Sequence, residues 1–402
     1  MADKTVTVKS VDGDYSSLNA AFSGEDGVAF DAYSGVLHIV CYNFADSIEA
    51  NTGTGFSSES STHYISIEAY DSHGGKLSTN SYRINHNLDN SNPSLWIEVD
   101  YTRISIQFTN TFLQTRYATH LLVLYSNYCI VKNCIFDSSG DTSTAGLDTH
   151  IILAASSATC YLINNVHDRF VASDSGTHKS VIRIEQATST AYIYNCTICN
   201  VNNLDSANSW GIRNSGTCIV KNTLFYNCEN DATGTISDTY CSTTNDNTKG
   251  LTAAGTGNRF SQTFTFIDSG NFDFHLDPDD AGALGYGLNL YNDATYPFQD
   301  DIDGQDRGGS GATWDIGADE YVITLAIEQE GFWFRNDDGS ESTATGKGNK
   351  DANITLNSDT QARLRMLLNV TGDPASKNFQ LEYRYKPSGG AFGSWTKINL
   401  LG

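Results

Sequence analysis

Short apolar runs separated by polar bends recur along the middle of this chain. Four segments start 30 residues apart: HLLVLYSNYCIVKNCIF at 120, HIILAASSATCYLINNVH at 150, SVIRIEQATSTAYIYNCTI at 180 and WGIRNSGTCIVKNTLF at 210. Each is typical of a strand, a polar bend and a second strand that ends in asparagine, at Asn133, Asn164, Asn195 and Asn222. The pattern predicts one structural unit repeated at a fixed period.

Alternation along the first strand of each repeat predicts which side chains face inward. One inward position is predicted to hold Leu122, Ile152, Ile182 and Ile212, and the opposite face Val123, Leu153, Arg183 and Arg213. A coil of this kind buries its apolar face only by stacking on its neighbours, so we expect a parallel β-solenoid. The equivalent asparagines are then expected to form a structural ladder, and weaker strands are predicted upstream at 35–42, 63–70 and 102–108.

A second set of apolar residues falls on the face predicted to point outward. It consists of Leu121, Ile151 and Val181, together with Val123 and Leu153. An apolar stripe of this length needs a cover. Long loops of the same chain or identical neighbouring chains would both supply one, and the sequence leaves the two open.

Composition agrees with an all-β fold and limits the partners. Gly 35, Tyr 21 and Phe 19 against only two Met favour strands and turns. With 24 basic and 47 acidic residues, the formal charge of -23 repels nucleic acids and anionic membrane surfaces. The start MADKTVTVKS lacks a secretory signal and no apolar run reaches 18 residues, so we expect synthesis in a cytoplasm and no membrane insertion.

The nine cysteines favour core packing over metal binding. CTIC at 196–199 is the only C-x-x-C, so a zinc ribbon lacks its second pair. Cys129, Cys160 and Cys218 fall at equivalent positions of the repeats, whereas Cys134 recurs only at Cys196. We interpret these residues as small apolar core residues that remain reduced.

Three stretches carry a resemblance to a known superfold. They are GDYSSLNAAF at 13–22, the coil repeats, and the closing DIDGQDRGGSGATWDIGADEY at 301–321. Over about residues 5–321 the chain resembles right-handed parallel β-helix proteins of the pectate-lyase-like superfold, in particular those found in bacteriophage and environmental viral sequences. The resemblance implies a capping helix, a β-helix and a closing element, but one superfold hosts lyases, hydrolases, adhesins and inert shafts.

The expected organisation is therefore an N-terminal strand and capping helix at 1–30, a right-handed parallel β-helix at 31–321, and a further domain at 322–402. Polar and apolar residues alternate between Gly, Asn, Asp and Pro turns in the last part. This alternation predicts a small antiparallel β-sandwich-like domain, which is a candidate assembly module.

Candidate catalytic and ligand-binding residues lie on the predicted outer positions and loops. Glycoside hydrolysis needs two carboxylates, and lyase chemistry a base with acidic calcium ligands. Arg183, Glu185, Arg213 and Asp168 are the catalytic candidates, but no pattern places a second carboxylate, so a salt bridge on a solvated face is the preferred interpretation. Trp210 and Tyr125 are candidates for contacting a glycan.

Candidate metal ligands cluster in QDDIDGQDRGG at 299–309. Asp301, Asp303 and Asp306 resemble a calcium loop but lack its twelfth-position Glu. The preferred interpretation is that Asp303 and Arg307 fix the closing loop, so no cofactor is expected, with structural calcium as the alternative. His120 and His150 begin adjacent repeats, but two imidazoles without a third ligand do not make a metal site.

Taken together, these features predict a structural or binding protein of a viral particle, made in the host cytoplasm. Such a fibre, spike or surface decoration would present loops to a host-surface glycan and assemble as a homo-oligomer, expected to be a trimer, with other virion proteins. The alternatives are a polysaccharide lyase or glycoside hydrolase of tailspike type, and an extracellular adhesin or filament subunit.

Overall fold

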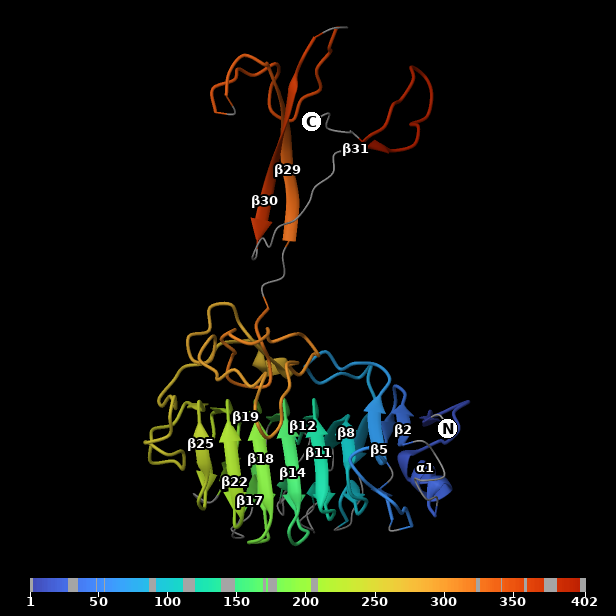
Figure 1. The fold of residues 1–402 in the computed structure, drawn as a ribbon, viewed down its shortest axis with the longest axis vertical. Coiled ribbons are helices and arrows are strands. Elements are labelled where there is room, and N and C mark those ends of the chain that lie inside the picture. Colours follow the sequence, from blue (N-terminus) through green and yellow to red (C-terminus); the bar gives the residue numbers. More distant parts are fainter. Residues whose placement is uncertain are drawn as a thin grey trace. The chain divides into compact units, whose positions relative to one another are not determined.

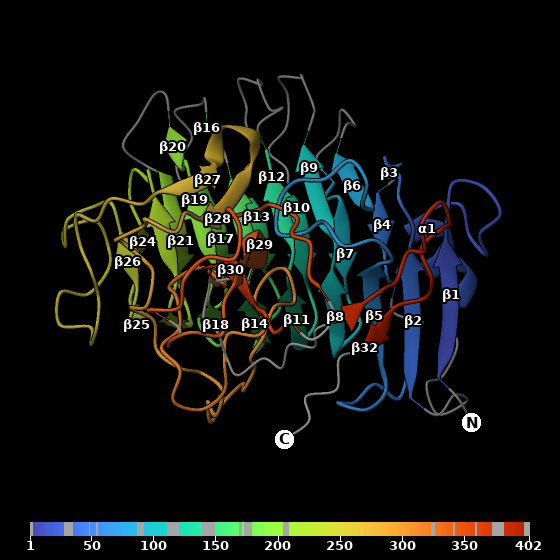
Figure 2. The same cartoon turned by 90° about the horizontal axis from the view of Figure 1, so that it is seen from above.

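The protein is an all-β chain with a parallel solenoid as its main body. The computed structural model describes residues 3–27, 35–47, 49–53, 55–86, 92–110, 120–138, 149–168, 171–172, 179–203, 209–322, 326–340, 342–357, 360–371 and 382–397. The chain divides into two compact units, Met1–Tyr321 and Val322–Gly402. Stacked parallel strands form the first unit, and two antiparallel strand pairs lie in the second (Figure 1, Figure 2). The predicted parallel β-solenoid is therefore confirmed.

Three parallel sheets run the length of the solenoid. The first sheet contains β1 (Lys4–Val8), β2 (Val36–Cys41), β5 (Tyr64–Ala69), β8 (Thr102–Ser105), β11 (Tyr128–Lys132), β14 (Thr159–Ile163), β18 (Thr190–Tyr194), β22 (Thr217–Lys221) and β25 (Ser237–Thr239). The second contains β4 (Ala50–Asn51), β7 (Leu95–Ile97), β10 (His120–Leu124), β13 (Thr149–Leu153), β17 (Lys179–Ile184), β21 (Ser209–Asn214) and β24 (Ala232–Thr233). The third contains β3 (Ala45–Asp46), β6 (Arg83–His86), β9 (Gln107–Asn110), β12 (Ile135–Asp137), β15 (Val166–Asp168), β19 (Thr197–Cys199), β23 (Leu224–Tyr226) and β26 (Ser242–Thr243).

Smaller elements complete the solenoid. β16 (Val171–Ala172) pairs with β20 (Asn202–Asn203), and β27 (Phe266–Asp268) with β28 (Asp273–Leu276), next to the 3-10 helix η2 (Ser269–Asn271). Helix α1 (Leu18–Glu25) buries Leu18 and Phe22 and starts after the expected position, because Ser17 caps it by accepting a hydrogen bond from Ala20 N at 3.1 Å. Within the described residues, no helix has the length and apolarity to cross a membrane.

The register of the second sheet corrects the predicted outer stripe. Leu122 pairs with Ile151, which pairs with Ile182, so Ile151 and not Ile152 holds the inward position. Four of the five residues of the stripe belong to the core: Leu121, Ile151, Leu153 and Val181. For Ile151 and Leu153 the prediction failed because period-two alternation has no defined phase inside a continuous apolar run. Leu121 and Val181 directly precede the inward Leu122 and Ile182 and are buried in the same cluster, so strict alternation does not hold at the start of these strands. Val123 faces outward as predicted, and Ile152 faces outward beside it.

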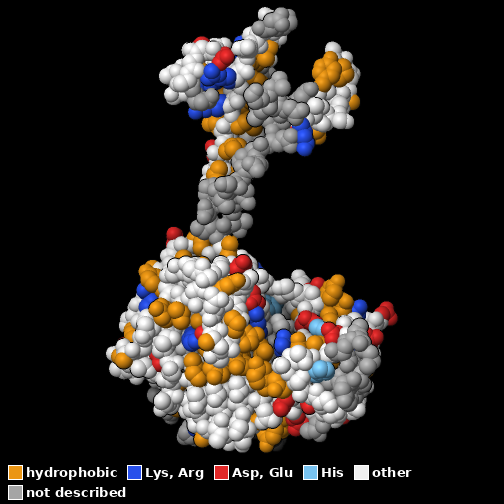
Figure 3. All heavy atoms as spheres, viewed as in Figure 1, with side chains coloured by type: hydrophobic (Ala, Val, Ile, Leu, Met, Phe, Trp, Pro, Cys, Tyr) orange, Lys and Arg blue, Asp and Glu red, His pale blue; other side chains and the backbone are white. Residues whose placement is uncertain are grey.

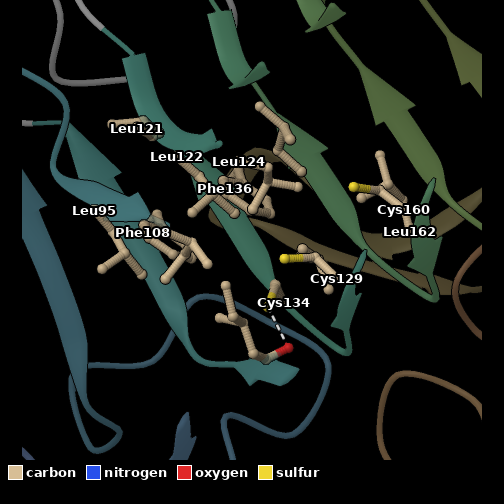
Figure 4. Packing of buried hydrophobic residues seen from close by; sticks show 14 of the residues in the cluster. Leu95, Phe108, Leu121, Leu122, Leu124, Cys129, Cys134, Phe136, Cys160 and Leu162 are labelled. Atoms are coloured by element: carbon tan, nitrogen blue, oxygen red, sulfur yellow. Dashed lines mark hydrogen bonds between the residues drawn. The ribbon is translucent and has the colours of Figure 1, made fainter. Parts of the chain in front are cut away.

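The core is a stack of like side chains in successive coils (Figure 4). Phe108 and Phe136 stack with ring centroids 4.7 Å apart. Cys129 lies in register with Cys160, and all nine cysteines are buried free thiols. The interpretation of cysteine as core residue is therefore confirmed for the folded chain.

The outer faces of the first and third sheets are partly covered by the closing segment, which we define as residues 259–321. Its Leu290, Phe298 and Trp314 pack on the outward Tyr161 and Tyr194 of the first sheet. On the third sheet, Phe274, Ile302 and Ala318 pack on Ile135 and Val166. Here the cover of these apolar surfaces comes from the chain itself.

The asparagines that end the first-sheet strands anchor the closing segment. Asn133, Asn164, Asn195 and Asn222 all adopt left-handed φ between 49° and 54°. Asn164 Nδ2 donates to Asn133 Oδ1 at 3.2 Å, and Asn222 Nδ2 to Asn195 Oδ1 at 3.2 Å. Between these pairs, Asn164 and Asn195 donate to the Asp300 and Gly317 carbonyls of the closing segment. The asparagines thus form two hydrogen-bonded pairs, and each pair is also hydrogen-bonded to the closing segment.

The C-terminal unit consists of two short antiparallel pairs. β29 (Ala326–Arg335) pairs with β30 (Arg363–Thr371), and β31 (Glu382–Tyr383) with β32 (Thr396–Lys397). Along β30, Leu364, Met366, Leu368 and Val370 alternate on one face and are 37–43 % exposed. Phe334 and Phe332 lie opposite Leu364 and Met366, so one face of this hairpin is apolar and open.

Candidate functional site on the outer face of the solenoid

Three of the four predicted catalytic candidates lie together, and the fourth, Asp168, lies apart from them. Arg183 Nη2 and Glu185 Oε1 form a salt bridge of 2.7 Å on the outer face of the second sheet, with Arg213 in register beside Arg183. Burial and the charge of Arg183 lower the pKa of Arg213. Asp168 instead lies buried at the end of β15 in the third sheet, where its Oδ1 accepts a hydrogen bond from Asn200 Nδ2 at 2.7 Å. The four residues therefore lie on two different sheets, and one of them is buried.

The predicted ligand-binding aromatics are also separated. Tyr125 follows β10 and is 53 % exposed, with Trp96 as a neighbour at 6.1 Å between ring centroids. Trp210 lies in β21 and is half-buried. Strands β13 and β17 separate β10 from β21, a distance of roughly 14 Å at the usual strand spacing. One sugar unit cannot contact both rings.

A groove on the outer face of the first sheet is a better candidate site. It crosses β5, β8 and β11 and encloses about 210 Å³. The groove is lined by Ser66, Glu68, Arg103, Ser105, Ile130, Lys132, Asn133 and, from the closing segment, Tyr296. A second hollow of about 200 Å³ adjoins it through Ser105 and Asn133 and is bordered by Tyr70, Ser72, His73 and Asp303. Together they form one depression lined by both polar and apolar groups, which we call the first-sheet groove.

The charged residues of the first-sheet groove differ in how they are paired. Lys132 Nζ lies 2.5 Å from Asp300 Oδ1, and Glu68 Oε1 lies 3.1 Å from His38 Nδ1. Arg103 is exposed and stacks its guanidinium 4.0 Å from the Tyr64 ring centroid. Among the described residues Arg103 has no carboxylate within salt-bridge distance. It is therefore a cation held in place by an aromatic ring and open to a ligand.

Aromatic rings extend from the groove along the outer face of the first sheet. Tyr101 and Tyr128 stack at 4.8 Å, Tyr128 and Tyr161 lie at 5.4 Å, and Tyr161 and Tyr192 stack at 4.9 Å between ring centroids. Tyr296 packs against Tyr161 at 5.1 Å. Burial raises the pKa of the Tyr128 and Tyr296 hydroxyls, so both remain neutral hydrogen-bonding groups at neutral pH. In Figure 3, hydrophobic side chains cover the middle of this face, with charged side chains and His beside them.

The three aspartates proposed as calcium ligands have different roles. Asp301 is buried and organises the closing loop, since its Oδ1 accepts from Asp303 N and Gln305 N and its Oδ2 from Glu320 N. Asp306 is exposed and accepts from Gly308 N. Within the described part of the chain, Asp303 alone of the three joins a group of metal-ligating side chains, and its neighbours there are His275 and Asp319.

Arg307 fixes the closing segment from within. Its buried guanidinium donates to the Gly317 and Ala318 carbonyls at 3.0 and 2.6 Å and to Glu320 Oε2 at 3.0 Å. Burial raises the pKa of Glu320 to about 8, although the charge of Arg307 opposes this. Arg307 therefore fixes the closing loop through Glu320 and backbone carbonyls.

The two histidines that begin adjacent repeats are not equivalent. His120 pairs in register with Thr149, which shifts His150 by one position. His150 Nδ1 lies 3.3 Å from His167 Nδ1 in the core, and its Nε2 lies 3.0 Å from Ser138 Oγ. The offset follows from the same one-residue register shift that moved Ile151 inward.

Sequence reasoning did not identify the first-sheet groove, although part of its signal was present. In TRISIQF the inward Ile104 and Ile106 place Arg103 outward, so alternation alone marked it as a surface cation. Tyr296 and Asp303 reach the groove from the closing segment, about 190 residues later in the chain, and no local pattern reports such a contact. No protein-family model, curated protein or solved structure matches this chain.

Proposed function

We propose that this chain is a homo-oligomeric β-solenoid that binds a saccharide in the first-sheet groove, as a fibre, spike or surface decoration of a viral particle. The observation that carries the saccharide-binding role is the open groove across three coils with Arg103 stacked on Tyr64. The viral setting rests on the sequence resemblance of the repeats and the closing element.

The groove has the groups that saccharide recognition uses. Sugar rings offer apolar C–H faces to aromatic rings and hydroxyls to charged and amide side chains. Tyr296 and the exposed Tyr70 at the groove supply the faces, while Arg103, Glu68 and Asn133 supply hydrogen bonds of both polarities. Since the groove crosses three coils at the strand spacing, an extended chain fits this surface better than a single sugar.

Binding is tested by screening the full chain against bacterial surface polysaccharides and then titrating a hit by calorimetry. We expect Arg103→Ala and Tyr64→Ala to weaken binding at least tenfold, and Arg183→Ala, which removes an outward arginine of the second sheet, to leave it unchanged. A hit that Arg183→Ala weakens and Arg103→Ala does not would refute the groove as the site. The same incubations are examined for reducing ends and unsaturated products, and their appearance would favour the lyase or hydrolase alternative.

The C-terminal unit supports the homo-oligomer part of the proposal. An isolated two-stranded ribbon is marginally stable, and the apolar face of the β29–β30 hairpin is open. Residues 322–402 contain nine acidic and nine basic residues, so the formal charge of -23 belongs to residues 1–321. Copies of the solenoid repel one another, whereas this neutral hairpin meets no such repulsion, and a second copy of the hairpin is the occupant its apolar face fits.

The oligomer is tested by native mass spectrometry and light scattering of the full chain. A trimer is the expected species. Met366→Asp with Leu368→Asp should dissociate it, because both changes place charge on the apolar face. Asn369→Asp lies on the opposite face and serves as the control. A monomeric wild-type chain at micromolar concentration would overturn this part of the proposal and leave the saccharide site untouched.

A further inference from the structure

A cluster of charged side chains lies where β28 meets the loop at 299–309 of the closing segment. His275 Nε2 lies 2.9 Å from Asp303 Oδ2, and one ligand atom from each of His275, Asp303 and Asp319 falls within 4.8 Å of the others. We propose that these three side chains bind one divalent transition-metal ion, and that Zn²⁺ is the ion they favour. The site does not depend on the saccharide-binding role of the groove.

The donor set matches the chemistry of such an ion. One imidazole nitrogen with two carboxylates suits zinc, whereas calcium prefers six to eight oxygens. Tetrahedral ligands at about 2.1 Å from a metal lie about 3.4 Å apart, so the 2.9 Å between His275 Nε2 and Asp303 Oδ2 already fits. The ligand atoms of the three residues lie within 4.8 Å of one another, so the Asp319 carboxylate would move inward by up to about 1.4 Å. Zn²⁺ would replace the proton that His275 Nε2 shares with Asp303.

The surroundings of the imidazole are those of a metal-bound histidine. Asp273 Oδ1 is hydrogen-bonded to His275 Nδ1 and leaves Nε2 directed at Asp303. A carboxylate on the far nitrogen is the usual arrangement behind a metal-bound histidine, because it fixes the tautomer and the ring orientation. Lys76 Nζ lies 3.1 Å from the other oxygen of Asp273 and holds that carboxylate in turn.

Two observations point to a missing ligand. Asp303 Oδ1 is shielded from solvent and has no hydrogen-bond partner among the described residues. Buried carboxylate oxygens without partners are costly, and a cation bound by both oxygens of Asp303 would satisfy this one. Gly75 lies over the cluster, where a Cβ would come within 2.3 Å of both Asp303 Oδ1 and His275 Nε2. Glycine therefore keeps free the space beside both donor atoms.

Without a metal the same residues form an ion-pair network. Burial alone would lower the pKa of His275, but its hydrogen bond to Asp303, the charge of Asp319 and its hydrogen bond to Asp273 raise it to about 10. The imidazolium is then the cation among three carboxylates. A zinc titration therefore tells whether His275 gives up this proton to a metal ion or keeps it in an ion-pair network.

The test uses the full chain after treatment with a chelator and dialysis. Zinc chloride is titrated by calorimetry and the bound metal is counted by elemental analysis. We expect one Zn²⁺ per chain, a higher melting temperature with zinc, and little binding of Ca²⁺ or Mg²⁺ at the same concentration. Asp303→Asn and Asp319→Asn should each weaken zinc binding at least tenfold, and Asp273→Asn by about 10–100-fold. Asp306→Asn changes an exposed carboxylate of the same loop and should bind zinc as the wild type does.

A measurement on the wild-type chain keeps the proposal testable if a variant does not fold. Zinc should perturb the imidazole NMR resonances of His275, which neighbours the added ion, and leave those of the remote His38 unchanged. Failure of the wild-type chain to bind zinc, or equal losses in Asp303→Asn and Asp306→Asn, would show an ion-pair network only. Neither result would affect the prediction that Arg103→Ala weakens saccharide binding.

Discussion

Acidification should weaken the middle of the solenoid through two histidines in its core. His150 and His167 are fully buried, with their rings 5.6 Å apart and stacked below Phe136. Burial lowers the pKa of His150 to about 3, and burial together with the nearby His150 lowers the pKa of His167 well below its usual range. Both rings are therefore neutral in the folded chain across the range where free histidine titrates.

The change in folding stability with pH follows from the difference in bound protons between the folded and the unfolded chain. Above pH 6.5 the imidazoles are neutral whether the chain is folded or not, so this stability is fully present. As pH falls below 6.5 the unfolded chain gains protons that the folded chain cannot accept, and stability is lost down to pH 3. At pH 5 the loss for His150 is about 2 kcal/mol, since each pH unit contributes about 1.4 kcal/mol. His167 adds a loss in the same direction.

The comparison needs a variant in which each histidine is replaced by an apolar residue of the kind found at the same position in the neighbouring coils. His167 lies in register between Phe136 and Ile198, and His150 lies one position after Thr149, between Leu121 and Val181 of the neighbouring coils. His150→Leu with His167→Phe removes both titrating groups and keeps the core apolar. Carboxylates elsewhere titrate equally in both chains and cancel in the comparison.

Hydrogen exchange read by mass spectrometry measures the local opening free energy of peptides that contain β13 and β15. After correction for intrinsic exchange, protection in the wild-type chain should fall at least 30-fold from pH 7 to pH 5, and by much less in the double variant. Equal falls in the two chains would show that these histidines do not carry the effect, and would refute the reasoning.

Three further predictions concern stability and reactivity. Arg307→Met removes the donor shared by the Gly317 and Ala318 carbonyls and Glu320, all inside the closing segment, and should lower the free energy of unfolding by about 3–5 kcal/mol, measured by urea denaturation with Trp fluorescence. Asn195→Gly keeps the left-handed backbone but loses the amide bonds to the closing segment, so it should cost about 1–3 kcal/mol by the same method, and an unchanged midpoint would contradict the anchoring role. Burial raises the pKa of Cys134 and Cys196 to about 12, so an aromatic disulfide reagent should label none of the nine thiols of the native chain and all nine after denaturation; rapid native labelling would contradict their burial.

The solenoid could be predicted because its information is local and repeated. Each of the four clear repeats carries its own strand pattern, and its first-sheet strand is followed by an asparagine whose side chain tolerates the left-handed bend. The sequence could not show which of two neighbouring residues faces inward within an apolar run. In HIILA every residue from Ile151 to Ala154 is apolar, so alternation could not decide whether Ile151 or Ile152 faces inward, and only pairing with Leu122 decides it.

The candidate sites could not be predicted for a different reason. The first-sheet groove combines strand residues such as Arg103 with Tyr296, and the metal cluster combines His275 with Asp303 and Asp319. These contacts depend on how an irregular segment folds back over the coils, and such a path has no periodic pattern. The sequence marked Asp303 as a ligand candidate from its acidic loop, but the imidazole that accompanies it lies 28 residues earlier.

The closing segment changes how this solenoid should come apart under load. In a simple stack each coil contacts only its neighbours, so opening spreads from an end one coil at a time. Here the segment is fastened to Lys132 through Asp300, to Asn164 and Asn195 through its backbone, and to Lys221 through Asp293. Four successive coils are thus tied by a strap that crosses them. A pulling force should peel the first N-terminal coils gradually and then release the strapped coils in one abrupt step.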